Sequence, residues 1–313
     1  MGEIPRSASQ PNDRDALIFR QIPRMTLSSA ENPLNAPLPP DSTLTSPSTR
    51  ALSRFAVEGN AVITGGAGAL GMATARSLLE HGLSSLALLD LSTTLESSAP
   101  DIARLRTDFA ANSSCEIHTF SVDVTSPILV NETIEKAATV MGGIDILLCL
   151  AGIVGCEEST AVTADAFMKV IDVNLKGSFV CAQAVAKHMI ERKKGGSIVF
   201  TGSISAHLTN FPQPQVAYNA SKAAVVHMAR NLAVEWAVYG IRVNSVSPGY
   251  MDTVLNAGEN LKELREIWAS NCPMGRMGDV EEITGAFVLL ASKRAGRYMT
   301  GADIVVDGGA VCL

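Results

Sequence analysis

Short apolar runs alternate with longer amphipathic segments from residue 61 onward. Several runs are almost continuously apolar, which is typical of parallel strands that are covered on both faces. The segments between them have helical length, and Gly, a common helix stop, closes several. Strands that alternate with helices predict right-handed crossovers and an α/β fold with a doubly wound parallel sheet. We expect about seven strands, at 61–64, 86–90, 117–124, 144–152, 197–202, 241–249 and 303–309.

The first 54 residues lack this alternation. They hold eight of the fourteen prolines, eight serines and no sustained hydrophobic period. Because such a composition cannot form a packed core, we divide the chain into a disordered or loosely packed extension, 1–54, and a single domain, 55–313. The extension has no apolar stretch of the secretory type. Its arginines are typical of mitochondrial presequences but its acidic residues are not, so we expect a cytoplasmic protein, with a mitochondrial location as the alternative.

Composition excludes several classes of function. Apolar residues make up 47% of the chain and the net charge is −6, which gives no basic surface for nucleic acid. No apolar run reaches the ~20 residues that span a bilayer. The six cysteines are scattered, without a C-x-x-C pair or a histidine at metal-ligand spacing. We therefore expect no nucleic-acid partner, no membrane segment, no metal site and no disulfide framework.

The first predicted strand runs into TGGAGALG, residues 64–71, and a helix follows at once. Glycines at such a turn let the backbone approach a pyrophosphate, and the helix N-terminus offers unpaired N–H groups to its oxygens. Gly66, Gly68 and Gly71 have the spacing G-x-G-x-x-G. Asp90 closes the second strand 19 residues after Gly71, where a carboxylate accepts hydrogen bonds from the adenosine ribose. The combination predicts a Rossmann-type domain that binds NAD, with NADP as the alternative, because the flanks of Asp90 carry no Arg or Lys.

Further polar residues follow the fifth predicted strand. This strand ends in SIVFTG and leads to Ser203, and the next helix contains AYNASKA. Tyr218 and Lys222 are four residues apart there, so they share one face of the helix. A lysine ammonium one turn away favours the phenolate and lowers the pKa of a tyrosine from about 10. Spacing alone leaves open whether this pair is ordinary helix surface or an acid with the group that tunes it.

The ordered set of motifs resembles the short-chain dehydrogenase/reductase family over about residues 55–313. The set comprises the glycine turn, the acid that closes the second strand, DV at 123–124, Asn in IDVNLKG, the serine at the strand end, Y-x-x-x-K and SPG at 247–249. PQPQVAYNASKAAV and VSPGYMDT further resemble fungal polyol dehydrogenases. The resemblance implies an NAD(P)-dependent oxidoreductase that interconverts a secondary alcohol and a ketone, with a sugar alcohol or ketose as the leading substrate.

The resemblance also implies roles for single residues. Tyr218 would take the proton of the alcohol, or return it to the ketone, with Lys222 and the positive nicotinamide ring lowering its pKa. Ser203 would stabilise the charge that develops on the substrate oxygen, and Asn174 would hold a water near Lys222. Spacing to the tyrosine fits Ser205 as well; we prefer Ser203, because the strand end fixes its place whereas loops absorb insertions. Asp123 would cap the adenine and Thr253 would meet the carboxamide. The expected catalytic residues are Ser203, Tyr218, Lys222 and Asn174, and the expected cofactor-binding residues are Gly65, Gly68, Leu70, Gly71, Asp90, Asp123, Asn174, Tyr218, Lys222, Met251 and Thr253.

Two positions depart from the family pattern. Cys149 and Leu150 replace Asn-Asn, which removes side-chain hydrogen bonds near the central strand. Ala69 replaces a glycine of the turn and would be strained at a positive φ. These departures keep a non-catalytic binding protein as an alternative, and reduction of a ketone in a secondary-metabolite pathway is another.

The resemblance has three further implications. The helix after Tyr218 pairs with its copy in related enzymes, so we expect a homo-oligomer, a dimer or a tetramer. The amphipathic segment 251–272 would form a mobile lid over the substrate. His207, just past the serine, is a candidate to line the substrate pocket.

Overall fold

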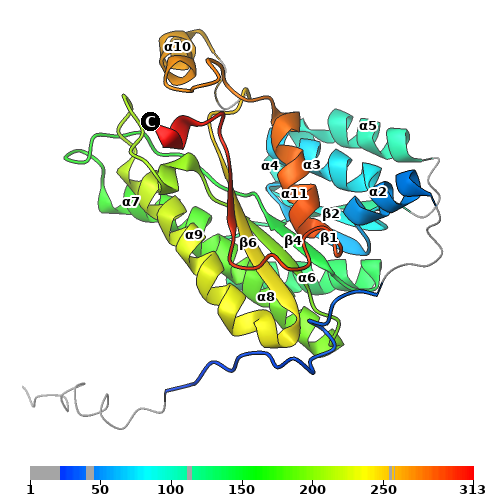
Figure 1. The fold of residues 1–313 in the computed structure, drawn as a ribbon. Coiled ribbons are helices and arrows are strands. Elements are labelled where there is room, and N and C mark those ends of the chain that lie inside the picture. Colours follow the sequence, from blue (N-terminus) through cyan, green and yellow to red (C-terminus); the bar gives the residue numbers. More distant parts are fainter. Residues whose placement is uncertain (1–21, 40–45, 111–114, 254–255, 257) are drawn as a thin grey trace, which may run out of the picture.

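Seven parallel strands form one sheet in the order β3-β2-β1-β4-β5-β6-β7 (Figure 1). The computed structural model describes residues 22–39, 46–110, 115–253, 256 and 258–313. The sheet grows outward in both directions from β1 and β4, so the predicted single-domain, doubly wound Rossmann-type fold is confirmed. The strands are β1 (Asn60–Thr64), β2 (Ser85–Asp90), β3 (Glu116–Ser121), β4 (Ile146–Cys149), β5 (Gly196–Thr201), β6 (Ile241–Pro248) and β7 (Asp303–Val306).

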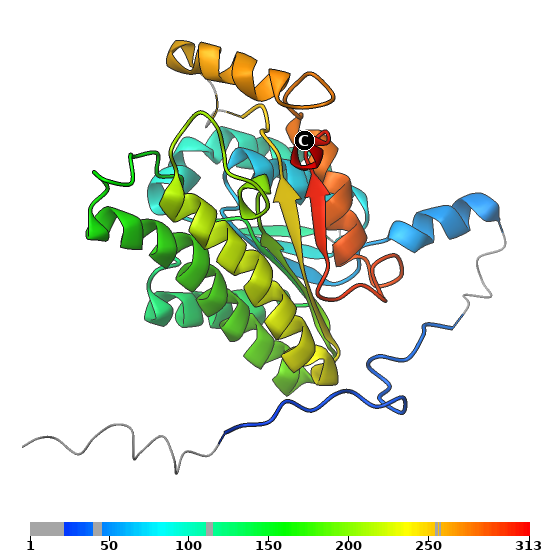
Figure 2. The ribbon, with the colours of Figure 1, turned by 60° about the vertical axis from the view of Figure 1, so that its left-hand side comes forward.

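Helices cover both faces of the sheet (Figures 1 and 2). Each face has its own cluster of buried aliphatic side chains, which explains why the strands are apolar on both sides. One face carries α6 (Pro127–Met141), α7 (Ala164–Ile171), the π-helical turn η1 (Asp172–Gly177), α8 (Ser178–Arg192) and α9 (Val216–Trp236). The other carries α3 (Ala69–Glu80), α5 (Ala99–Phe109) and α11 (Thr284–Ala291). Within the described ranges no helix is both long and apolar enough to cross a bilayer.

Three short helices lie outside these two layers. They are α2 (Pro47–Phe55), α4 (Ser92–Ser97) and α10 (Lys262–Ser270). Figure 1 shows α10 alone above the carboxyl ends of the strands. Of the predicted lid, the structure describes 251–253, 256 and 258–272, and only α10 and the preceding 3₁₀ turn η5 (Glu259–Leu261) are helical there.

Several strands end earlier than their apolar runs. Residues 122–124, 150–152 and 307–309 follow β3, β4 and β7 but lie outside the sheet. Residues 122–124 and 150–152 continue the apolar pattern because Val122 and Val124 are buried and Leu150 packs against the core as the chain leaves the sheet. Two of these segments line a cavity at the carboxyl edge, so the overlong predictions mark the positions at which the sheet opens toward the site.

Residues 22–39 of the predicted extension contact the segments that precede β6 and β7, at the amino ends of the strands. In Figure 2 residues 22–39 run beneath the domain. Asn32 and Asn35 donate side-chain hydrogen bonds to the carbonyls of Val238 and Ala237, at 2.9 and 2.8 Å. Arg297 donates to the carbonyl of Ala36 at 2.8 Å. This segment is therefore held by polar contacts rather than by a core of its own.

Candidate active site

The glycine turn joins β1 to α3 in a shape that only glycine fits. Gly65 has a φ of +66°, and a Cβ there would come within 2.6 Å of the Ala151 nitrogen. A Cβ on Gly71 would come within 2.3 Å of the Gly65 carbonyl oxygen. Ala69 is the first residue of α3, and Lys193 is the sole non-glycine with a positive φ in the described ranges. The strain expected at Ala69 is therefore absent, because Gly65 takes the left-handed position.

A cavity of about 830 Å³ opens beside this turn. Its wall includes Gly65 and Gly68 at one side and Asp90 and Asp123 along the carboxyl ends of β2 and β3. The turn leaves no room for a side chain, and Gly68 is the N-cap of α3, whose first N–H groups are free to bind an anion. A dinucleotide fits these residues: backbone for its phosphates, a carboxylate for its ribose and a long cavity for its length.

Both carboxylates already have partners in this cavity. Asp90 accepts hydrogen bonds from the backbone nitrogens of Ala67, at 3.1 Å, and Leu91, at 2.9 Å. The first bond ties the ribose-binding position to the glycine turn. Asp123 accepts from the backbone nitrogen and the hydroxyl of Thr125, at 2.9 and 2.8 Å. Each carboxylate is thus held in place by its own loop.

The catalytic candidates meet at the carboxyl end of β5. Tyr218 lies in the first turn of α9 and Lys222 one turn later, with its Nζ 5.6 Å from the centre of the Tyr218 ring. Lys222 is only 5% exposed and donates one hydrogen bond, 2.8 Å long, to the carbonyl of Thr201, the last residue of β5. Ser203 follows two residues later and is 7% exposed. A strand end and a helix start therefore bring the three side chains together, as the spacing predicted.

Burial dominates the proton affinities of the pair. It raises the pKa of Tyr218 above its ordinary value of 10, and the Ser203 hydroxyl opposes that shift. Burial also lowers the pKa of Lys222 to about 8. From the protein groups alone, loss of hydration therefore raises the Tyr218 pKa. The expected lowering also involves the positive nicotinamide ring and stays a prediction for the protein with its dinucleotide. Lys222 still carries a proton at pH 7.

Asn174 supports the pair from the opposite side. It lies in η1, a local widening of the helix that is often found at functional sites. Its amide accepts a hydrogen bond from the Ile153 nitrogen at 2.8 Å and donates to the Ile153 carbonyl and to the Ser221 hydroxyl, both at 3.0 Å. A Cβ on Gly152 would lie 3.3 Å from the Asn174 oxygen and 3.6 Å from Lys222 Nζ. Gly152 therefore lies next to both Asn174 and Lys222, where a side chain would crowd the two groups.

The two candidate serines have different partners. Ser203 donates to Ser205 at 3.1 Å and is the serine that influences the Tyr218 pKa. Ser205 donates to the side chain of Asn210 at 2.7 Å and accepts from Gln215 at 3.2 Å. This arrangement favours Ser203 as the serine that acts with Tyr218, and gives Ser205 a supporting position behind it.

A second cavity, of about 320 Å³, lies on the other side of Ser203 and Tyr218. Leu261, Leu264 and Trp268, from the lid segment, form part of its wall. Its polar wall includes residues that the sequence analysis did not single out, although two motifs around them were noted. They are Asn210, Gln213 and Gln215 of NFPQPQ, and Tyr250 of SPGY.

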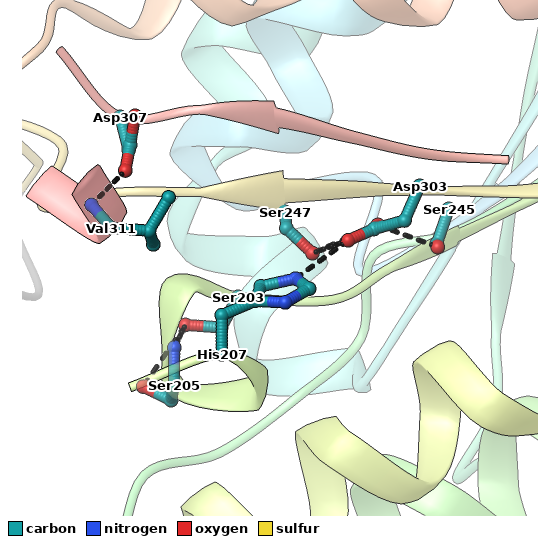
Figure 3. Close-up of polar contacts among 8 residues, drawn as sticks. All are labelled: Ser203, Ser205, His207, Ser245, Ser247, Asp303, Asp307 and Val311. Carbon is teal, nitrogen blue, oxygen red and sulfur yellow. Dashed lines mark hydrogen bonds and ion pairs between the residues drawn. The ribbon is translucent and has the colours of Figure 1, made fainter. Parts of the chain in front are cut away.

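His207 does not line the substrate cavity. Figure 3 shows its ring turned toward Asp303, the first residue of β7, with Nε2 2.7 Å from a carboxylate oxygen. The same carboxylate accepts hydrogen bonds from Ser245 and Ser247 of β6 at 2.6 and 2.9 Å. His207 ends the short helix η2 (Ile204–Ala206) that follows Ser203. Its bond to Asp303 thereby fixes the serine segment to the far half of the sheet.

Seven of the eleven expected cofactor-binding residues do not line the large cavity, and three of these seven, Leu70, Met251 and Thr253, have other surroundings. Leu70 packs against the core beneath α3. Met251 lines a separate cavity of about 200 Å³ and pairs with Gly278. Thr253 is partly buried, and its carbonyl accepts a hydrogen bond from the Asn256 nitrogen at 2.9 Å. The structure therefore brings Gly65, Gly68, Asp90 and Asp123 together but not these three.

The Cys149-Leu150 substitution is accommodated by the core. Cys149 is 2% exposed at the end of β4. The nitrogens of Leu150 and Ala151 donate to the carbonyl and the hydroxyl of Thr64, at 3.0 and 3.4 Å. Backbone contacts with β1 thus hold the end of the strand without the missing asparagines.

Comparisons with known proteins agree with this geometry. Residues 65–311 match the family model described as enoyl-(acyl carrier protein) reductase. The D-arabinitol 2-dehydrogenase (ribulose-forming) of Scheffersomyces stipitis is 38% identical, over 82% of this chain and 96% of its own length. The NADP-dependent mannitol dehydrogenase of Hypocrea jecorina is 36% identical, over 83% and 95%. A short-chain type dehydrogenase/reductase from Mycobacterium marinum, solved as a crystal structure, is 39% identical with a TM-score of 0.76, over 84% of this chain and 99% of its own.

Proposed function

The chain belongs to the short-chain dehydrogenase/reductase family, and we propose that within it the protein interconverts a secondary alcohol of a polyol and the corresponding ketose. One observation carries this proposal. Ser203 and Tyr218 line the smaller cavity, while Lys222 lies against Gly152 in the wall of the larger one. A proton-transfer group therefore stands between a site for a small molecule and a site for a nicotinamide dinucleotide.

Each protein group has a part in the oxidation of the alcohol. Tyr218 takes the hydroxyl proton, and Ser203 donates a hydrogen bond to the same oxygen as charge develops on it. Lys222 keeps a positive charge beside the phenolate. When bound, the dinucleotide accepts a hydride from the carbon that bears this oxygen. In the reverse direction Tyr218 returns the proton to the ketone oxygen.

The variant Tyr218→Phe tests the role of the phenol. Phe keeps the ring but cannot exchange a proton, so we expect turnover to fall by about 10²- to 10⁴-fold while the affinity for the dinucleotide stays near that of the wild type. Rates are followed by absorbance of the reduced dinucleotide, and binding by its fluorescence. Tyr239→Phe, at the opposite end of α9 and 41% exposed, is the matched control. Wild-type rates for Tyr218→Phe would exclude this mechanism.

NAD is the dinucleotide we propose. Asp90 stands where a 2′-phosphate would lie, and like charges repel. The relative from Hypocrea jecorina is named NADP-dependent, which favours the phosphorylated form instead. Fluorescence titration with NADH and NADPH compares the two affinities directly. Asp90→Ser should lower the ratio of the NADPH to the NADH dissociation constant by about 10-fold. Tighter binding of NADPH by the wild type would refute the preference.

Reduction of a less polar ketone is the second candidate. The lid side of the smaller cavity is lined by Leu261, Leu264 and Trp268, which suits an apolar substituent. The polyol proposal instead relies on the amides opposite them. A panel of polyols, ketoses and aliphatic ketones distinguishes the two.

Assembly and location complete the proposal. Ile171, Leu175, Phe179, Ala224 and Met228 line an apolar depression on the face formed by α7, η1, α8 and α9. A homo-oligomer, a dimer or a tetramer, would cover it. All six cysteines are free, which suits the reducing conditions of the cytoplasm. The division into an extension, 1–54, and one domain, 55–313, remains part of this proposal.

A further inference from the structure

The hydroxyl of Tyr250 receives two hydrogen bonds in the smaller cavity. Asn210 donates to it from 2.7 Å and Gln213 from 2.5 Å. Both donors come from the loop before α9, whereas Tyr250 follows β6. A phenol oxygen has two acceptor positions and one proton. The two amides thus occupy the acceptor positions and leave the proton.

Neighbouring groups fix the direction of these bonds. Trp268 of α10 donates its indole N–H to the Gln213 oxygen at 3.1 Å, and an indole nitrogen can only donate. The amide of Gln213 must therefore present its NH₂ group to Tyr250. The Ser205 hydroxyl accepts hydrogen bonds from Ser203 and Gln215. Its own proton therefore goes to the Asn210 oxygen, 2.7 Å away. The NH₂ group of Asn210 therefore faces Tyr250 as well.

The proton of Tyr250 has no acceptor in the described part of the chain. Burial raises the pKa of Tyr250, with the two amide bonds opposing the shift, so the phenol keeps its proton at neutral pH. The residue lines the same cavity as Ser203 and Tyr218. A donor in that position is available to a ligand.

We infer that Tyr250 is a specificity-determining residue that donates a hydrogen bond to a substrate oxygen other than the reacting one. The reacting oxygen is already assigned to Ser203 and Tyr218, so the second oxygen must lie on another carbon. This requirement selects hydroxylated ketones and polyols over ketones with a single oxygen. The inference rests on the proposed function and deepens it.

The lid reinforces this arrangement. The Tyr250 ring stacks on the indole of Trp268, with centres 4.4 Å apart and planes 5° from parallel. Trp268 therefore holds both the ring of Tyr250 and, through Gln213, the direction of its hydroxyl. A lid that places Trp268 here completes the donor as it covers the substrate.

The test compares two ketones that share a carbon chain. Erythrulose carries additional hydroxyl groups and butan-2-one carries none. The wild type should prefer erythrulose in kcat/KM, and Tyr250→Phe should reduce the ratio of the two kcat/KM values by about 10-fold or more, mainly through the KM for erythrulose. The control Tyr239→Phe should keep the wild-type ratio.

A second variant keeps the Tyr250 phenol but changes the direction in which its proton points. Gln213→Glu has nearly the same shape but, when ionised, offers only acceptors. The Tyr250 proton then turns to residue 213, so the preference for erythrulose should fall although Tyr250 is intact. Binding of the reduced dinucleotide, followed by its fluorescence, verifies that each variant is folded.

Different outcomes refute different statements. An unchanged ratio in Tyr250→Phe, or an equal loss of activity on both ketones, overturns the assignment of Tyr250. A wild type that reduces butan-2-one as well as erythrulose contradicts the polyol activity while leaving the acid-base mechanism in place. A wild type that reduces neither ketone overturns both proposals.

Discussion

Lys222, which is buried, and Arg242, which is partly buried, are two cations at opposite ends of the same sheet. Arg242, near the start of β6, donates to the carbonyls of Leu290 and Gly296 at 2.8 and 2.9 Å. Longer bonds reach Ser292 and Met299, at 3.4 and 3.5 Å. Lys222, at the carboxyl ends of the strands, donates a single hydrogen bond within the described ranges, to Thr201. Burial lowers the pKa of both groups, to about 10 for Arg242 and about 8 for Lys222.

The two cations differ in how many hydrogen bonds they donate to the surrounding backbone. The fork of Arg242 ties several carbonyls together, so its charge is spread over bonds that hold the fold. Lys222 has three N–H donors and uses one within the described residues. Two donors of its ammonium group are therefore free in this part of the chain, 5.6 Å from the centre of the Tyr218 ring. Arg242 thus joins segments of the fold, whereas the proposed role of Lys222 is in the reaction at Tyr218.

The largest expected effect is on activity, in Lys222→Met. Methionine fills a similar volume without the charge, so we expect kcat/KM to fall by about 10²-fold or more. The melting temperature of the cofactor-free protein should rise, because folding no longer buries a cation that prefers water. Activity assays and thermal unfolding measure the two. A variant that is both active and less stable would contradict the functional assignment of Lys222.

Arg242→Met should show the reverse pattern. Its loss leaves the carbonyls of Leu290 and Gly296 without their donor, so the free energy of unfolding should fall by about 1–3 kcal/mol. Turnover per folded molecule should stay within about twofold of the wild type, since Arg242 is remote from the cavities that hold Ser203 and Tyr218. Denaturant titration and assays below the unfolding transition check both statements. A large loss of turnover in folded protein would break the contrast with Lys222.

The smallest effect is on the pH dependence of stability. The pKa of Lys222 is about 8 in the folded chain and 10.5 ordinarily, so above pH 8 the unfolded chain holds a proton that the folded chain has released. The contribution of Lys222 to the free energy of unfolding therefore rises between pH 8 and 10, by on the order of 2 kcal/mol. Below pH 8 the full cost of burying the charge remains.

Only the difference between wild type and Lys222→Met isolates this contribution. Burial raises the pKa of Cys149 and Cys181, so these thiols lower the stability as the pH passes their ordinary value. Urea titrations of both proteins at several pH values from 7 to 10 measure the difference. Parallel curves for the two proteins would show that the pKa of Lys222 is not depressed.

Much of the fold follows from the sequence alone. All seven predicted strands are present, because apolar runs on both faces and intervening helices leave few other arrangements. Tyr218 and Lys222 share a face of α9 because their spacing is one helical turn. The glycine turn and Asp90 meet because the ends of adjacent parallel strands must lie together.

Other features depended on contacts between distant segments. The sequence left Ser203 and Ser205 both open, and the structure favours Ser203 through its contact with Tyr218. Burial of Tyr218, which raises its pKa, became known only from the structure. His207 turned to Asp303, 96 residues later in the chain. None of these can be read from local spacing.

The sequence by itself therefore determined the layers, the seven parallel strands and the residues that can carry the chemistry. Tertiary structure alone decided how those residues are hydrated and which groups face them. Periodicity acts over a few neighbouring residues, whereas hydration and hydrogen-bond direction depend on everything packed around a side chain. Tyr250 is the clearest case, since the amides that direct its proton lie 37 and 40 residues away and the indole that orients one of them, Gln213, lies on α10.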